Sequence, residues 1–403
     1  MSFDFATPIN RRQPRLSSDA AEDVIEWPSQ KWHRYDEDVL PLWVADMDFR
    51  SPPEVIEALQ ARLEHGVYGY GLVPDSLRAA LCEWSVRRYD WDIEAGWQHW
   101  LPGVVPALHL ASLAFTEPGD GVMTVTPIYP PFLQVARRTG RELQQAALVP
   151  PESEEGQWTL DLDALEAAVT ERTRLLLWCH PHNPTGRQWS HAELEGLAAF
   201  VERHDLVVVS DELHCDLLLD EGARHVPLAA AFPQLAARIV TLWAPSKTFN
   251  LAGLTAACAI ISDARLRRRF VETAKGLMPD GNVLGLVAAE AAFRHGEAWR
   301  QALLDVLRGH RRALVERVAR WPGVQLAAPQ STYLAWLDLR ESHVGSADSP
   351  AAELLKQAGV ALSDGADFGW PGFARLNFGT TAQQLELALE RMDRVLGKAS
   401  GKL

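Results

Sequence analysis

Three polar residues follow short apolar runs in the middle of the chain, and their types are suited to chemistry. Lys247 follows IVTLWAPS and is flanked by small and polar residues, in a setting that differs from that of an ordinary surface lysine. Asp211 follows LVVVS, where a buried acid is costly unless a cation or hydrogen bonds compensate it. Asn183 follows RLLLWC within HPHNPTG. Together they offer an amine, a carboxylate and an amide.

Each of these residues also has a structural interpretation when it is taken alone. Lys247 could be a solvated loop lysine, and Asp211 could cap a helix or join a structural ion pair. Asn183 could simply form the turn that the Asn-Pro and Thr-Gly pairs dictate. Their common order along the chain, each after an apolar run, favours a shared site.

The elements that must position these residues are strands alternating with helices. GVMTVTP, RLLLWCHP, LVVVSDE and IVTLWAP are short apolar runs, and helical patterns such as residues 162–171 and 191–204 separate them. This alternation predicts an α/β fold with a mostly parallel sheet covered on both faces. Ligands of such sheets bind beyond the carboxyl ends of the strands, where Tyr129, Asn183, Asp211 and Lys247 stand.

The alternation of apolar runs and helical patterns does not extend to the two ends of the sequence. We predict an extended N-terminal arm over residues 1–50, a large domain over 51–295 and a smaller α+β domain over 296–403, which the arm completes. The large domain should begin with a helix that Ser51 caps and prolines open. The small domain should contain a long helix at 297–321, strand-like segments at 331–340 and 373–380, and a terminal helix.

Composition limits the partners. The 403 residues carry a formal net charge of -14, so neither nucleic acid nor an anionic membrane is an expected partner. The four cysteines lie far apart without metal-ligand spacing, and we expect free thiols in a reducing cytoplasm. No signal peptide and no membrane-spanning stretch is evident.

HNPTG around Asn183, SDELH with Asp211, SK at Lys247 and ARLNF with Arg375, in this order, resemble the class I/II aminotransferase superfamily of fold-type I enzymes that use pyridoxal 5'-phosphate (PLP). The resemblance covers nearly the whole chain, from LPLWVADMDF to the last helix. It implies the fold-type I PLP-dependent transferase fold. It also implies an enzyme of amino-acid metabolism.

The resemblance implies a role for each matching residue. Lys247, preceded by Ser246, would form the aldimine with the cofactor, and Asp211 would hold the pyridinium proton. Asn183 would hydrogen-bond the ring hydroxyl and Tyr129 would stack on the ring. The remaining assignments are the turn Gly103, Val104 and Val105 for the phosphate, Arg375 and Ala45 for the substrate carboxylate, and Tyr70 for the phosphate of the neighbouring subunit in a homodimer.

Departures from the common aminotransferase pattern narrow the resemblance. His214 stands where those enzymes usually have Tyr, and Ala244 and Thr255 stand where they often have Ser and Arg. These substitutions, with DELHCDL, APSKTFNLAGL and STYLAWLDLR, resemble the cystathionine β-lyase (carbon-sulfur lyase) branch. This branch would release thiol, pyruvate and ammonia from L-cystathionine or related cysteine S-conjugates. An aminotransferase shares the same residues and remains the alternative.

Other interpretations stay open beside this one. The chain could be a catalytically idle PLP-fold regulator, although such a protein would be expected to lose Lys247 or Asp211. His214 could contact the cofactor near its ring hydroxyl or pack in the core. His180, His182, Asp46 and Asp48 lack the helical spacing of zinc ligands, so we expect no metal, and the basic run RLRRR reads as a solvated helix face.

Overall fold

The computed structural model describes residues 3–12, 28–153, 156–279 and 281–398, and it divides into two compact units. Unit 1 comprises Met1–Arg50, Val306–Leu326 and Tyr333–Leu403; unit 2 comprises Ser51–Asp305 and Ala327–Thr332. The second boundary therefore falls ten residues beyond the predicted 295/296. In addition, six residues of the predicted small domain belong to unit 2. Part of the predicted arm, residues 13–27, lies outside the described residues.

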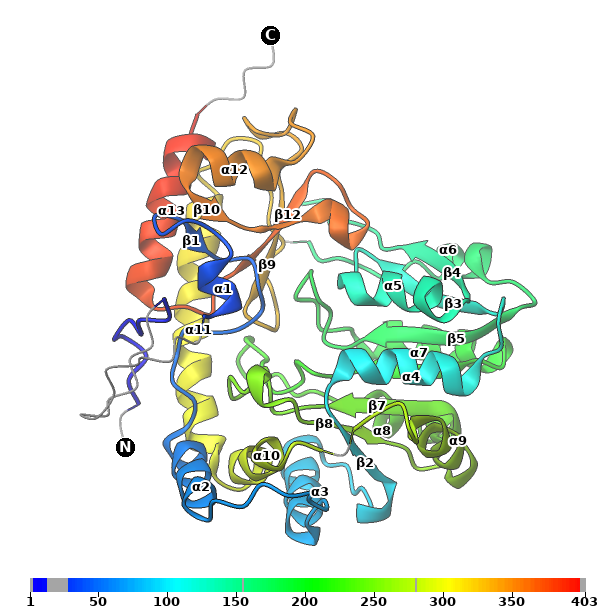
Figure 1. Cartoon of the computed structure of the whole chain (residues 1–403). Helices are drawn as coiled ribbons and strands as arrows, with labels where there is room; N and C mark the ends of the chain where they lie inside the picture. Colours follow the sequence, from blue (N-terminus) through cyan, green and yellow to red (C-terminus); the bar gives the residue numbers. More distant parts are fainter. Residues whose placement is uncertain (1–2, 13–27, 154–155, 280, 399–403) are drawn as a thin grey trace. The chain divides into compact units, whose positions relative to one another are not determined.

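A seven-stranded sheet is the centre of unit 2 (Figure 1). Its order is β2-β8-β7-β6-β5-β3-β4, and the five strands from β7 to β4 are parallel, whereas β8 runs antiparallel to both of its neighbours. The expected α/β architecture is confirmed. The strands are β2 (Gln98–Leu101), β3 (Gly121–Thr126), β4 (Glu142–Ala147), β5 (Thr173–Cys179), β6 (Val207–Asp211), β7 (Ile239–Trp243) and β8 (Ala257–Ile260).

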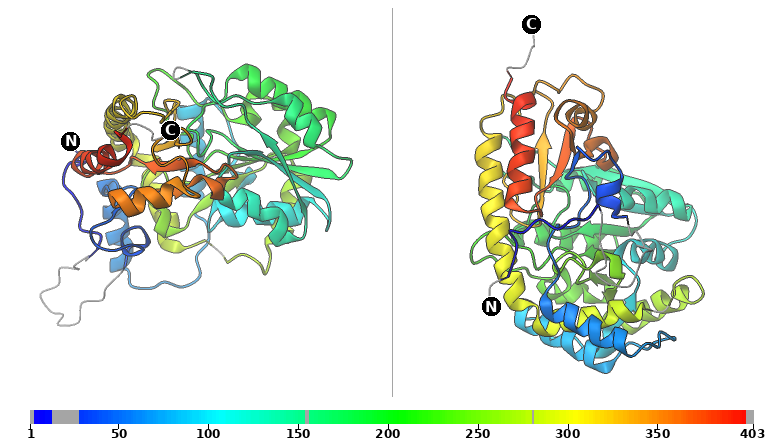
Figure 2. Two further views of the ribbon diagram at one scale, coloured as in Figure 1. Left: turned by 90° about the horizontal axis from the view of Figure 1, so that it is seen from above. Right: turned by 60° about the vertical axis from the view of Figure 1, so that its left-hand side comes forward.

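Helices cover both faces of this sheet. On one face, α4 (Val104–Phe115), α5 (Pro130–Thr139) and α9 (Ala264–Ala274) bury their apolar sides in one core cluster with β3, β5, β6, β7 and β8. On the opposite face lie α6 (Leu162–Ala168), α7 (His191–Arg203) and α8 (Leu228–Ala231) (Figure 2). The apolar strand runs follow from this double coverage, because both faces of each strand are buried.

A second group of helices in unit 2 consists of α2 (Pro53–Glu64), α3 (Asp75–Tyr89) and α10 (Val283–His295), in which α10 packs against both α2 and α3. The sequence correctly predicted a proline-opened helix here, but the cap was wrong. Pro52 occupies the N-cap of α2 and makes no side-chain cap bond. The Ser51 hydroxyl instead donates to the Asn250 carbonyl at 3.1 Å.

Unit 1 is a small α+β assembly in which β1 (Leu40–Pro41) from the N-terminal part pairs in parallel with β10 (Val360–Ala361). An antiparallel sheet has the order β11-β12-β9. Arg317 binds Glu386 and Asp393, which joins the end of the long helix to the terminal helix; the two run side by side in Figure 2. The elements are α1 (Gln30–His33), the later part of α11 (Glu297–Val318), β9 (Leu334–Asp338), α12 (Pro350–Ala358), β11 (Ser363–Asp364), β12 (Phe373–Asn377) and α13 (Ala382–Leu396).

Among the described residues, no helix is both long enough and apolar enough to cross a membrane.

Candidate active site

Four predicted site residues gather at one edge of the sheet in unit 2. Asp211 is the last residue of β6, and Lys247 lies in a turn just after β7. Asn183 follows β5, and Tyr129 follows β3 as the N-cap residue of α5. These strands are parallel and adjacent in the sheet, so their carboxyl ends share one edge.

Asp211 is the most strongly perturbed acid of this edge. Burial raises its pKa from 3.8 to about 7, although the Leu213 amide, which donates to Oδ1 at 3.1 Å, and the charge of Lys247 act to lower it. The neighbouring Glu212 adds to the increase. A cationic partner at the Asp211 carboxylate would relieve this cost, because an opposite charge favours the ionised form.

The loop of Asn183 is fixed to the neighbouring strand end. The amide of His180 donates to the Asp211 carbonyl at 2.9 Å, and the amide of His182 donates to the Arg187 carbonyl at 2.8 Å. Gly186 has φ +69°, and a Cβ there would lie 2.5 Å from the Pro329 side chain. A glycine is therefore required, and the loop holds the buried Asn183 in a defined place.

The N-terminus of α4 lies just after β2 and is a suitable anion site. Gly103 is its N-cap residue, with extended backbone and no side-chain cap bond, and Val104 and Val105 form the first turn. The first amides of a helix have no intrahelical acceptor, and the helix dipole favours an anion beside them. These residues could hold a phosphate.

The turn of Lys247 is held by hydrogen bonds to Asp216. Thr248, directly after the lysine, donates to Asp216 Oδ2 at 3.4 Å, and the Tyr89 hydroxyl donates to Asp216 Oδ1 at 2.5 Å. Ser246 and Lys247 are half-buried, so both remain accessible to a ligand. Thr255, at the position where related enzymes often carry Arg, is exposed in a left-handed backbone conformation.

A buried pair beside Asp211 was not predicted from the sequence. Nε2 of His225 lies 2.8 Å from Oε2 of Glu212, and both side chains are fully buried. The Glu212 carboxylate also accepts from the Ser210 hydroxyl at 2.8 Å and from the Leu228 amide at 3.0 Å. The position of Glu212 after an apolar run was an available signal, because a buried acid needs partners. Nothing local identifies His225.

The remaining histidine candidates are packed within unit 2. His214 is buried, as either interpretation of it requires. Nε2 of His180 lies 3.2 Å from the Val226 carbonyl, and Nδ1 of His182 lies 2.8 Å from the Thr185 hydroxyl. Burial, followed by the charge of Arg187, lowers the pKa of His182 to about 3, so the ring is neutral. The described residues contain no group of three or more His, Cys, Asp or Glu side chains that could hold a metal.

Tyr70 lies in the connection between α2 and α3 and is fully exposed in the single chain, with a relative accessibility of 103%. Val67, Tyr68 and Leu72 in the same connection are also exposed. Four large apolar or aromatic side chains close together at the surface are characteristic of an interaction site.

The two residues predicted to bind a substrate carboxylate lie in unit 1. Arg375 is a buried residue of β12, and its Nη2 donates to the Trp43 carbonyl at 3.0 Å. The guanidinium carbon lies 4.9 Å from the centre of the Phe368 ring. Ala45 is buried, and its carbonyl accepts from the Tyr333 hydroxyl at 3.0 Å. Arg375 and the loop of Ala45 are thus linked through Trp43.

Comparisons with known proteins agree with the fold and identify relatives. The family model for aminotransferase class I and II matches residues 37–392. The cystathionine beta-lyase PatB of Bacillus subtilis (strain 168) is 36% identical over 392 residues, covering 94% of this chain and 100% of that protein. The crystal structure of OvoB has a TM-score of 0.89 at 42% identity, covering 98% of this chain and 100% of that chain. The PLP-bound C-S lyase from Staphylococcus hominis has a TM-score of 0.88 at 28% identity, covering 98% and 99% of the two chains.

Proposed function

Because this chain belongs to the aminotransferase class I and II family, we propose that it is a PLP-dependent carbon-sulfur β-lyase. Its substrates are L-cystathionine or related cysteine S-conjugates, and its products are a thiol, pyruvate and ammonia. The observation that carries this choice over an aminotransferase is the similarity to the cystathionine beta-lyase PatB along 94% of the chain. The resemblance of the sequence to the carbon-sulfur lyase branch is consistent with it.

The residues at the strand ends of unit 2 fit PLP. Asp211 is a buried acid whose raised pKa calls for a cation, and a protonated pyridine nitrogen supplies one. The uncapped first turn of α4, from Gly103 to Val105, suits the phosphate. Asn183 would bind the ring hydroxyl, and Tyr129 would stack on the ring. Ser246 and His214 complete the proposed set of cofactor contacts.

PLP, when bound, supplies an electron sink that stabilises negative charge at the substrate Cα. Lys247 would hold the cofactor through a covalent link and would be the base that takes the Cα proton of the substrate. The electron pair of that C–H bond forms the Cα–Cβ double bond as the Cβ–S bond breaks, and the sulfur leaves as thiolate. Water then converts the remaining fragment to pyruvate and ammonia. Asp211 would hold the proton on the pyridine nitrogen.

Arg375 and Ala45 are proposed to bind the substrate carboxylate. The planar guanidinium of Arg375 can form two parallel hydrogen bonds with a carboxylate, which a lysine cannot do. Its Nη2 contact with the Trp43 carbonyl and its place over the Phe368 ring hold the guanidinium plane. The amide of Ala45 would provide a further donor.

The active unit is proposed to be a homodimer, in which Tyr70 binds the cofactor phosphate of the neighbouring subunit. The full exposure of Tyr70 and the apolar character of its surroundings support this arrangement. The cytoplasmic location expected from the cysteines stays a prediction.

The test is a product assay on the purified, PLP-loaded protein with L-cystathionine and no added keto acid. Pyruvate and free thiol are measured together over many turnovers. Sustained, equimolar release of both is the expected result. If the cofactor converts once to its amine form and turnover requires a 2-oxo acid, the protein is an aminotransferase. A protein that cannot be loaded with PLP would instead favour the idle regulator.

A further inference from the structure

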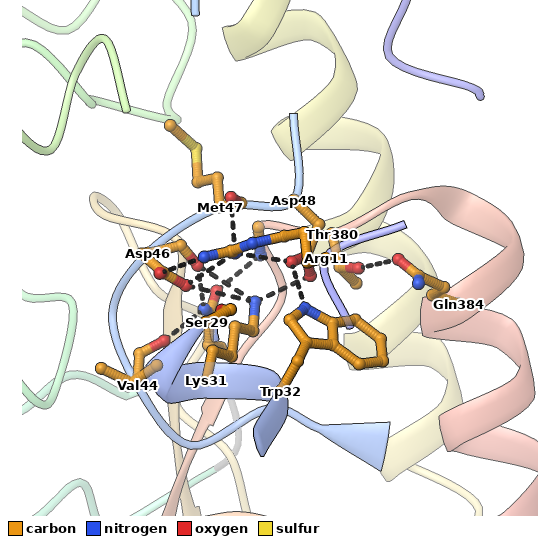
Figure 3. Close-up of polar contacts among 12 residues, drawn as sticks. Arg11, Ser29, Lys31, Trp32, Val44, Asp46, Met47, Asp48, Thr380 and Gln384 are labelled. Atoms are coloured by element: carbon orange, nitrogen blue, oxygen red, sulfur yellow. Dashed lines mark hydrogen bonds and ion pairs between the residues drawn. The ribbon is translucent and has the colours of Figure 1, made fainter. Parts of the chain in front are cut away.

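Four charged side chains of unit 1 form a compact group, here called the charged cluster: Arg11, Lys31, Asp46 and Asp48 (Figure 3). Nζ of Lys31 lies 2.7 Å from Asp48 Oδ2, and Nη1 of Arg11 lies 2.8 Å from Asp48 Oδ1. Nη2 of Arg11 lies 2.8 Å from Asp46 Oδ2. The two cations and two anions balance, so the cluster has no formal net charge.

The cluster is buried at its centre. Lys31 is 0% exposed and Asp48 is 2% exposed. Burial acts to raise the pKa of Asp48, but the charges of Lys31 and Arg11 outweigh it, so the pKa lies below the ordinary value. A buried ion pair contributes little more to stability than a well-packed apolar pair of the same size. The ion pair instead fixes the geometry of the two side chains, because each buried charge loses the opposite charge that stabilises it when the two move apart.

The geometry that the cluster fixes is that of the 43–47 segment, Trp43 to Met47. Lys31 brackets this segment, because its Nζ donates to the Asp46 carbonyl at 3.1 Å and its own carbonyl accepts from Nε1 of Trp43 at 3.2 Å. Nη1 of Arg11 donates to the Met47 carbonyl at 3.2 Å. The cluster therefore holds both ends of the segment.

The other side of the 43–47 segment contacts β11, β12 and the residue before β9. All five carbonyls of the segment accept a hydrogen bond, which holds its backbone in place. The side chains that donate to these carbonyls, at 2.5 to 3.0 Å, are Arg375 and Ser363 to Trp43, Asn377 to Val44 and Asp46, and Tyr333 to Ala45. Arg375 also donates to the Ser363 hydroxyl at 3.4 Å.

We propose that the charged cluster positions Arg375 for the substrate carboxylate through the 43–47 segment. Lys31 and Asp48 are positioning residues in this arrangement and do not touch the substrate. The Trp43 carbonyl takes one guanidinium nitrogen of Arg375, which sets the direction of the others, and the same segment carries Ala45. The inference rests on the proposed function, because it assumes that Arg375 binds the carboxylate of the amino acid.

The experiment measures binding of L-alanine and of ethylamine to the PLP-loaded protein by the absorbance change of the cofactor. L-alanine has no leaving group at Cβ, and ethylamine lacks the carboxylate. Lys31→Met removes the ammonium and keeps most of the stem. We expect it to weaken L-alanine binding roughly tenfold and to leave ethylamine binding unchanged within about twofold. With L-cystathionine, KM should rise and kcat should change little.

A matched control and a double-mutant cycle separate positioning from general damage. Lys356→Met makes the same substitution at an exposed lysine of α12 and should change the binding of neither L-alanine nor ethylamine. In an Arg375→Ala background, Lys31→Met should weaken L-alanine binding by much less than tenfold, since both act through one contact. Equal weakening of L-alanine and ethylamine, or full additivity with Arg375→Ala, would overturn the proposal.

Two further variants keep the test decisive. If Lys31→Met does not fold, the combination with Asp48→Asn leaves no unpaired charge, and Arg11→Gln removes the partly exposed cation of the cluster. Both should show the same selective loss for L-alanine. If Arg375→Ala itself leaves L-alanine binding intact, the proposed role of Arg375 fails. If Arg375→Ala weakens binding and the cluster variants do not, only the positioning inference fails.

Discussion

Nε2 of His225 lies 2.8 Å from Oε2 of Glu212, and neither side chain is exposed. Glu212 directly follows Asp211, and its amide donates to the Leu242 carbonyl of β7 at 3.0 Å. The pair therefore lies one residue beyond Asp211, at the end of β6 where the backbone of Glu212 is joined to β7.

His225→Leu should destabilise unit 2, because it removes one hydrogen-bond partner of the buried Glu212 carboxylate, which keeps its contacts with the Ser210 hydroxyl and the Leu228 amide. Removing one hydrogen-bond partner of a buried acceptor costs about 1 to 3 kcal/mol. Urea unfolding of the PLP-free protein measures this free energy. His204→Leu is the matched control, since its Nε2 lies 2.9 Å from Glu166 but the pair is partly exposed, and about 1 kcal/mol or less is expected there. Equal losses in the two variants would contradict the prediction.

Asp211 should make the stability of the PLP-free protein depend on pH. Burial raises its pKa in the folded chain to about 7, from 3.8. The folded chain then keeps a proton that the unfolded chain releases, so the free energy of unfolding falls as pH rises from about 4 to about 7 and is level above that. The total change is on the order of 4 kcal/mol.

Urea unfolding across this pH range checks the prediction, with Asp211→Asn as the comparison. The asparagine variant should lack this part of the pH dependence because it does not titrate. Added PLP should also reduce the slope in the unsubstituted protein, since a pyridinium cation stabilises the ionised acid. Identical slopes in the two proteins would show that Asp211 is not the group responsible.

Lys247→Ala should lower the rate of pyruvate release by about 10³-fold or more, because it removes both the covalent link and the base. The variant should fold normally, since Lys247 is half-buried in a turn. Circular dichroism checks the fold, and acid treatment of borohydride-reduced protein checks the covalent link to PLP, which should be absent. Full activity in this variant would remove the central assignment.

Tyr70→Phe should weaken PLP binding by roughly tenfold if the hydroxyl binds a phosphate in the neighbouring subunit, because such charge-assisted bonds are strong. Tyr68→Phe is the control. Tyr68 lies in the same connection, but its hydroxyl donates to the Leu63 carbonyl at 2.9 Å. Equilibrium dialysis gives both dissociation constants, and sedimentation gives the oligomeric state. A monomer with full activity would refute the dimeric site.

The order of the elements in unit 2 could be predicted from the sequence because parallel strands buried on both faces are apolar along their length. Asp211, Asn183 and Lys247 stood out for the same reason, as polar residues at the ends of such runs. The capping of α2 was misjudged because Ser51 found a tertiary acceptor, the Asn250 carbonyl, in place of a local one.

The sequence by itself determined the α/β class, the strand-end set of Tyr129, Asn183, Asp211 and Lys247, and the family. These depend on local patterns, namely apolar runs, turn residues and motifs in a fixed order. Only the tertiary structure decided that His225 pairs with Glu212 and that Lys31 and Arg11 hold Asp46 and Asp48. The physical reason is that a buried polar or charged group must be paired, and the partner can come from any part of the chain that folding brings within a few ångströms.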